Sequence, residues 1–258
     1  FVQYITPRDL SKCKVGQCKY VILVDENGGI LNDPVLLKLG ENHFWLSLAD
    51  NDILLWAKGI AAHTNFDVKI TEPDVSPLQV QGPKAANLMR DLVGEWIDQL
   101  RYFRFREYEI EGIPVIISRT GWSNEKGFEI FLRDGSRGDE LWELIMAAGR
   151  PYQIAPGAPS TIKRIEAGLL SYYTDMSLTE NPYEMGLGKY IDLEQEADFI
   201  GKEALKEIAS QPLKRKLVGL EIMDAKPMGT NVFWWDVSHK GEKVGQMTNN
   251  VYSPRLEK

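Results

Sequence analysis

Apolar positions along the chain follow two periods, and each period predicts a different kind of element. Alternating or short continuous apolar runs are typical of strands, and they cover residues 20–24, 35–39, 44–48, 78–81, 108–110, 115–118 and 128–132. Asn27-Gly28-Gly29 supplies the positive φ angles of a tight turn, and Gly112 supplies a hairpin turn.

Apolar residues spaced three and four apart predict helices between these strands. Asp50 or Asn51 is suited to cap a helix over 53–60, and Gly82-Pro83 opens one that reaches Trp96. Further helices are predicted over 141–148 before Gly149, from a Ser160 cap through Leu169, and over 198–208.

Gln211-Pro212 marks a boundary, and three further strands are predicted after it, over 217–223, 232–237 and 244–248. Helices and strands are grouped and do not alternate as βαβ units. The pattern therefore predicts an α+β protein with a β-rich C-terminal module.

Composition narrows the classes of function. The chain has 258 residues, of which 43% are apolar and 26% charged, as in a globular protein with a sizeable core. A net charge of -7 argues against a nucleic-acid or anionic-membrane partner. No apolar run reaches the roughly 18 residues of a membrane span, and no signal peptide is visible. We therefore expect a cytoplasmic protein, here a fragment lacking both ends because Phe1 is not an initiator Met.

Cysteine and histidine usage predicts neither a disulfide framework nor a metal site. Cys13 and Cys18 are too few for a framework. His43, His63 and His239 form no sequence cluster, whereas a structural zinc site needs four ligands.

The stretch from Thr120 to Phe131 is the first candidate site. Two glycines bracket a polar turn, and in the strand that follows Glu129 and Phe131 point to the same face. A carboxylate beside an aromatic ring, with Trp122 nearby, suits a flat heterocycle or a small cation. The same pattern also fits an ordinary hairpin with a core Phe and an exposed Glu.

The turn from Gly28 to Pro34 is the second candidate site. Asp33 lies at the mouth of a strand after a glycine turn, which is a reasonable catalytic position. Asn and Asp are equally common as plain turn residues. No nucleophile elbow, P-loop or dinucleotide-binding fingerprint occurs, so hydrolase and nucleotide-dependent functions lack support.

Five segments in register resemble the folate-dependent glycine cleavage T-protein (aminomethyltransferase) family. They are Gly28-Gly29-Ile30-Leu31-Asn32-Asp33, Leu78-Gln79-Val80-Gln81-Gly82-Pro83, Thr120-Gly121-Trp122 with Gly127-Phe128-Glu129, Arg164-Ile165-Glu166-Ala167-Gly168-Leu169, and Asp198-Phe199-Ile200-Gly201-Lys202-Glu203-Ala204-Leu205. The resemblance implies a multi-domain clover-leaf with tetrahydrofolate in a central channel. It divides the chain into a domain with the catalytic turn (1–75), a folate-binding domain (76–210) and the start of a truncated β-rich domain (211–258).

Three departures from the patterns of that family stand out, and the first of them favours a branch that demethylates a sulfonium substrate. Asn32 replaces the catalytic Asp of aminomethyltransferases, Ser160 replaces a folate-contacting Arg, and Phe131 replaces a Tyr found in the demethylase pattern. Methyl transfer from the sulfonium to N5 of tetrahydrofolate is the implied reaction. An aminomethyl, dimethylglycine or sarcosine enzyme and a non-catalytic folate-binding protein are the alternatives.

The resemblance also assigns roles to individual residues. Asp33 is the expected catalytic residue, Glu129 binds the pterin ring, and Trp122 and Phe131 hold the cationic donor. Secondary expectations are folate contacts by Tyr20 and Phe103 and a donor contact by Ser47.

Overall fold

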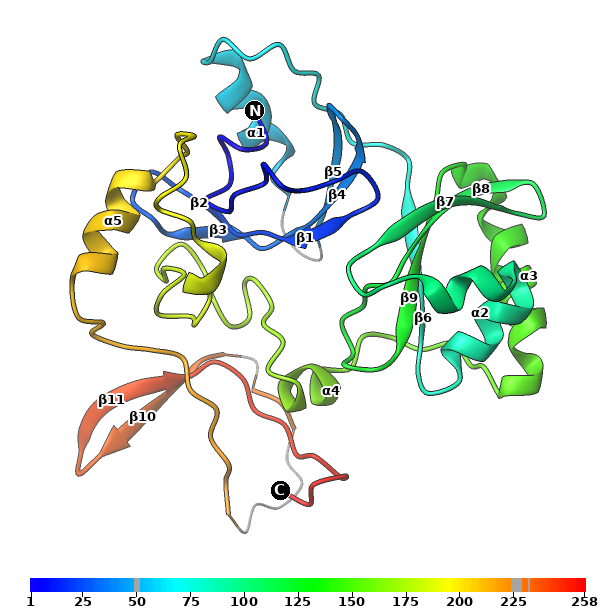
Figure 1. Cartoon of the computed structure of the whole chain (residues 1–258). Coiled ribbons are helices and arrows are strands. Elements are labelled where there is room, and N and C mark those ends of the chain that lie inside the picture. The colour runs from blue at the N-terminus through cyan, green and yellow to red at the C-terminus, as the bar shows by residue number, and fades with distance from the viewer. Residues whose placement is uncertain (49–51, 224–228, 232) are drawn as a thin grey trace.

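The computed structural model describes residues 1–48, 52–223, 229–231 and 233–258. Two lobes lie side by side, with a C-terminal hairpin below the first of them (Figure 1). The ladders between named strands are all antiparallel, as an α+β fold requires. The predicted fold class is therefore confirmed.

The first lobe is built on a three-stranded sheet in the order β1-β4-β5. A two-stranded sheet joins β2 to β3, and helix α1 follows β5 along the chain. The bounds are β1 Cys18–Tyr20, β2 Leu23–Val24, β3 Ile30–Asn32, β4 Val35–Gly40, β5 His43–Ser47 and α1 Leu54–Ala62. The predicted strand over 20–24 is thus split in two. The predicted caps Asp50 and Asn51 lie outside the described residues.

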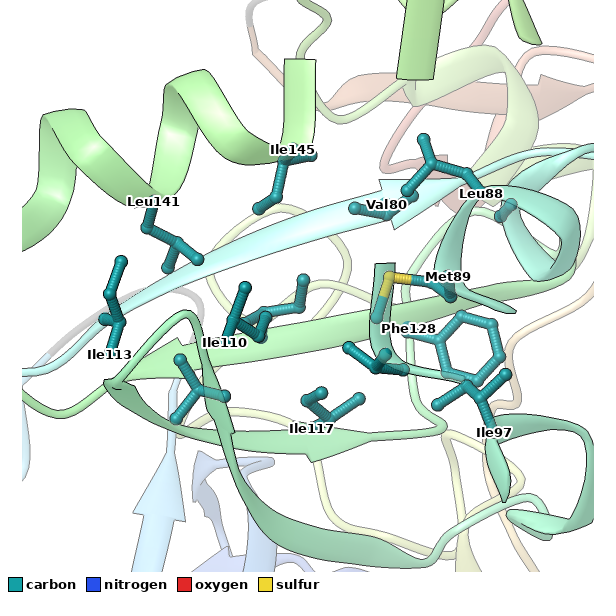
Figure 2. Packing of buried hydrophobic residues seen from close by; sticks show 14 of the residues in the cluster. Val80, Leu88, Met89, Ile97, Ile110, Ile113, Ile117, Phe128, Leu141 and Ile145 are labelled. Atoms are coloured by element: carbon teal, nitrogen blue, oxygen red, sulfur yellow. The ribbon is translucent and has the colours of Figure 1, made fainter. Parts of the chain in front are cut away.

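The second lobe is a four-stranded sheet in the order β6-β9-β8-β7, covered on one face by helices α2 and α3 (Figure 2). Its elements are β6 Ser76–Gln81, α2 Ala85–Val93, η1 Glu95–Gln99, β7 Phe105–Ile110, β8 Ile113–Ser118, β9 Gly127–Leu132, η2 Gly135–Arg137, α3 Gly138–Gly149 and η3 Arg150–Tyr152. Phe128 and Ile130 enter this core from β9 beside Ile117 of β8. Strand alternation then turns Glu129 and Phe131 to the opposite face, as predicted.

The chain beyond the second lobe returns to the first. Tyr172, Met176, Phe199 and Leu205 form one buried cluster with Ile30 of β3. Helix α5 (Lys202–Ser210) accordingly lies beside β2 and β3 in Figure 1. This packing joins residues 172–208 to the first lobe, whereas the predicted division placed them with the folate-binding domain. That division remains a prediction.

Two helix ends differ from the sequence expectation because glycine interrupts the helix. Ser160 caps α4 (Thr161–Glu166) as predicted, its Oγ accepting a hydrogen bond from the Lys163 amide at 3.3 Å. The helix stops before Leu169, because Gly168 adopts a φ of 66° and the Leu169 amide bonds back to the Arg164 carbonyl. Gly201, with a φ of 79°, similarly delays the start of α5.

The C-terminal part contains a hairpin of β10 (Trp235–His239) and β11 (Glu242–Met247). These strands match two of the three predicted, although residue 232 lies outside the described residues. The strand predicted over 217–223 is wrong: residues 217–222 form no ladder with any described strand. The Leu217 amide instead donates a 2.8 Å bond to the Glu184 carbonyl, outside any strand.

Candidate functional site

The two lobes meet across sheet faces that carry most of the predicted site residues. Tyr20, Val35 and Ser47 form one row across β1, β4 and β5. The next row on the same face is Cys18, Leu37 and Trp45, and these residues pack with Phe131 of β9. Residues that are far apart in the sequence therefore share one interface.

Asp33 follows β3 and is held by a tyrosine from β1. The Tyr20 hydroxyl donates a 2.7 Å hydrogen bond to Asp33 Oδ2. Burial and the neighbouring Asp33 carboxylate raise the pKa of Tyr20, so its hydroxyl stays protonated and donates. The buried Asn32 side chain accepts a 2.8 Å bond from the Asp33 amide. The Asn32 side chain thus holds the backbone amide of Asp33, and Asp33 supplies the carboxylate.

Two residues that the sequence did not single out contact Tyr20, and a third, Lys189, contacts one of them. The Tyr190 ring, in η4 (Gly188–Tyr190), packs edge-on against Tyr20 with 5.1 Å between ring centroids. The Arg8 guanidinium lies 5.0 Å from the Tyr190 centroid and donates a 2.5 Å bond to the Tyr20 carbonyl oxygen. Lys189 lies over the same ring at 5.1 Å. No periodicity marks Tyr190, because its role comes from a tertiary contact.

Glu129 projects from β9 into a partly buried polar network. Its Oε1 accepts a 2.9 Å bond from Gln79 of β6, and its Oε2 accepts one from the Thr120 hydroxyl. Burial raises the pKa of Glu129, and these two donors oppose that rise. An ionised carboxylate has about four acceptor positions, so Glu129 retains capacity for a paired N–H donor.

Two aromatic residues before β7 lie near this network. Tyr102 is largely exposed, and burial of its hydroxyl, followed by the charges of Tyr190 and Glu129, raises its pKa. Phe103 packs against Tyr102 with ring centroids 4.8 Å apart and against the Phe131 cluster. The Phe103 backbone has a φ of 56° and bonds both Cys18 and Arg119. Phe103 thus links the lobes, and its predicted folate contact stays a prediction.

Trp122 is fixed from both its edge and its face. Its indole Nε1 donates a 3.2 Å bond to the Leu170 carbonyl. The Arg164 guanidinium lies 5.6 Å from the ring centroid. Leu170 also packs against the cluster that contains Tyr20, which connects Trp122 to the first lobe.

Phe131 and Ser47 occupy different environments. Phe131 is 3% exposed and lies 6.2 Å from the Trp45 ring, so it offers little surface to a ligand. Ser47 is half-buried at the end of β5, in the row with Tyr20. Packing against the neighbouring core residues accounts for the aromatic ring at Phe131 without a bound substrate. The donor contacts of Phe131 and Ser47 stay predictions.

The glycine turn before Asp33 packs closely against the segment that contains Leu178 and Glu180. Gly29 donates a 2.7 Å bond to Asp25 Oδ1, and the Ile30 amide bonds the Glu180 carbonyl at 2.9 Å. A Cβ on Gly29 would overlap the Leu178 carbonyl oxygen.

We expect Gly29→Ala to destabilise the protein by about 1–3 kcal/mol, because the backbone around Leu178 must move. Urea unfolding measures the loss. Gly157→Ala is the matched control, since no atom lies within 4 Å of its added Cβ. Equal effects of the two substitutions would contradict this account.

Other features of the described residues lie away from this interface. A surface cavity of about 660 Å³ is lined by Phe1, Leu10, Phe44 and residues 194–197, and it includes none of the predicted site residues. The described residues contain no group of three potential metal-ligating side chains. Among them, no helix has the length and apolarity needed to cross a bilayer.

The fold and this arrangement define the class of protein. The family model for the GCVT N-terminal domain matches residues 1–195, so the chain belongs to that family. Glycine cleavage system aminomethyltransferase T of Bartonella henselae has a similar structure, with a TM-score of 0.81 and 25% identity over 99% of this chain and 70% of that one. The resemblance stated from the five sequence segments is confirmed.

Individual relatives refine the comparison. The chain is 42% identical over 255 residues to dimethylsulfoniopropionate demethylase of Ruegeria pomeroyi, covering 99% of this chain and 69% of that protein. It is 33% identical over 264 residues to an aminomethyltransferase of Bacillus cytotoxicus, covering 100% and 71%.

Proposed function

We propose that this protein is a tetrahydrofolate-dependent demethylase that takes a methyl group from dimethylsulfoniopropionate. Its products are methylthiopropionate and 5-methyltetrahydrofolate. The observation that carries the proposal is the Tyr20–Asp33 pair beside a buried Asn32, at the position where aminomethyltransferases usually have their catalytic Asp. Similarity to the Ruegeria pomeroyi demethylase supports the same donor.

Residues at the interface fit a flat, reduced pterin as the methyl acceptor. Glu129 is a partly buried carboxylate with free acceptor capacity, suited to a paired N–H edge. Tyr20, Tyr102 and Tyr190 supply aromatic surface nearby. Tetrahydrofolate, as the second substrate, supplies the N5 nucleophile.

Methyl transfer from a sulfonium needs little covalent help from the protein. The S–CH₃ bond breaks as the bond to N5 forms, and its electron pair stays on sulfur as a neutral thioether. N5 then loses its proton, and Asp33, oriented by Tyr20, accepts that proton and passes it to water. The remaining task is alignment of donor and acceptor, which is catalysis by proximity.

A cation must also be held beside the reacting atoms. The face of Trp122 supplies an attraction of about 0.5–2 kcal/mol for a sulfonium. A cytoplasmic location is part of the proposal and rests on the composition of the chain.

Donor profiling tests the proposal. The purified protein is incubated with tetrahydrofolate and either dimethylsulfoniopropionate, dimethylglycine or sarcosine, and methylthiopropionate and 5-methyltetrahydrofolate are quantified by mass spectrometry. We expect turnover only with the sulfonium donor. Turnover only with an amine donor would identify an enzyme of the aminomethyltransferase type. Folate binding without turnover of any donor would identify a non-catalytic folate-binding protein.

A further inference from the structure

Trp122, the proposed donor-binding residue, already has a cation against one face of its ring. Arg164 is only 3% exposed, and its guanidinium carbon lies 5.6 Å from the Trp122 centroid. An uncompensated arginine charge there would repel any second cation that approached the ring. A site for a sulfonium therefore needs that charge to be neutralised.

Asp175 supplies the neutralising charge within the same buried cluster. Its Oδ2 lies 2.6 Å from Arg164 Nη1, and the two side chains are 7% and 4% exposed. The same Arg164 nitrogen donates a 3.2 Å bond to the Leu169 carbonyl. Asp175 Oδ2 accepts a second bond, from the Ser171 amide at 2.9 Å, which holds the carboxylate toward the arginine.

The chain after α5 completes the cluster. Thr248, just beyond β11, donates a 3.3 Å bond to Asp175 Oδ1. Trp234, just before β10, donates a 2.8 Å bond to the Thr174 carbonyl, next to Asp175. Residues that flank the hairpin thus contact Asp175 and its neighbour Thr174.

We infer that Asp175 is a specificity-determining residue: by cancelling the charge of Arg164, it lets Trp122 accept a cationic donor. This inference rests on the proposed function, because it assumes that the donor contacts Trp122. Arg164 orients the indole ring, and the Asp175 carboxylate offsets the arginine charge that a bound cation would otherwise meet. Neither residue takes part in the bond changes, so both act through Trp122.

The test compares two propionates of similar shape, one with a sulfonium charge and one without it. Dimethylsulfoniopropionate carries the sulfonium charge, and methylthiopropionate lacks it. Calorimetric titration gives a Kd for each, and the ratio of the two Kd values isolates the effect of the charge. In Asp175→Asn we expect binding of the sulfonium to weaken about tenfold, with less than a twofold change for the thioether.

Two further variants separate charge from structure. Arg164→Gln leaves Asp175 without its cation, so the preference for the sulfonium should rise at pH 8, opposite to the effect of Asp175→Asn. Thr248→Val removes a hydrogen bond to Asp175 without changing any charge, and it should leave the ratio within twofold of wild type. Circular dichroism establishes that each variant is folded.

Each outcome decides between the inference and its alternatives. Equal weakening of both ligands in Asp175→Asn would show a purely structural role and overturn the inference. If Asp175→Asn does not fold, an unchanged or lowered preference in Arg164→Gln overturns it instead. A wild-type protein that forms no methylthiopropionate refutes the proposed function, whereas wild-type turnover with an unchanged ratio in the variants refutes only this inference.

Discussion

Replacing Asp33 with Asn is expected to lower kcat for methyl transfer by about 10²- to 10⁴-fold, the range over which a positioned general base contributes. The amide keeps the size of the side chain and can still accept the Tyr20 hydrogen bond, but it cannot take the proton from N5. Because donor and acceptor contacts are unchanged, KM for each should change by less than about threefold. Steady-state formation of methylthiopropionate measures both constants.

Tyr20→Phe is the control for this prediction, because it removes the hydroxyl that orients Asp33 and leaves the carboxylate in place. We expect a smaller fall in kcat, about tenfold, the equivalent of one hydrogen bond. If Asp33→Asn retained full turnover, Asp33 would have no role as a base. If the two substitutions had equal effects, orientation and not proton transfer would be the contribution of Asp33.

Local patterns in the sequence predicted the parts of the fold that local physics determines. Period-two alternation gave β9 and placed Glu129 and Phe131 on one face, which the structure confirms. The Ser160 cap was recognisable because a hydroxyl before a helical run has one dominant use. The end of α4 was missed, since the left-handed conformation of Gly168 outweighed the apolar periodicity that continues to Leu169.

The missed parts of the site depend on contacts between distant segments. Tyr190 meets Tyr20 across 170 residues of sequence, and Asp175 meets Thr248 across 73. Nothing in the local pattern around either pair predicts such a contact. The strand expected over 217–223 failed for the same reason, because an apolar run becomes a strand only where a partner strand lies beside it.

Replacing Glu129 with Gln is expected to weaken tetrahydrofolate binding by about 10- to 150-fold, because a hydrogen bond to a charged group contributes about 1.5–3 kcal/mol. The variant amide offers one acceptor oxygen where the carboxylate offers two, so the paired interaction with the pterin edge is lost. Fluorescence titration with tetrahydrofolate under anaerobic conditions measures the Kd. Glu125→Gln is the matched control: Glu125 is exposed and its carboxylate accepts a 2.6 Å bond from Lys163, so folate affinity should not change.

The same substitution should make the ligand-free protein more stable at neutral pH. Burial raises the pKa of Glu129 in the folded state above its unfolded value, so the charged form is disfavoured there. Glu129 therefore contributes its stabilising effect below its unfolded pKa, and that contribution is lost as the pH rises through the folded pKa. Glu129→Gln removes the penalty, and its Tm should exceed that of the wild type by a margin that grows from pH 4 to pH 8. A constant or reversed margin would show that burial does not destabilise the charged form of Glu129. The expected trend would show that Glu129 lowers the stability of the ligand-free protein and is kept for binding.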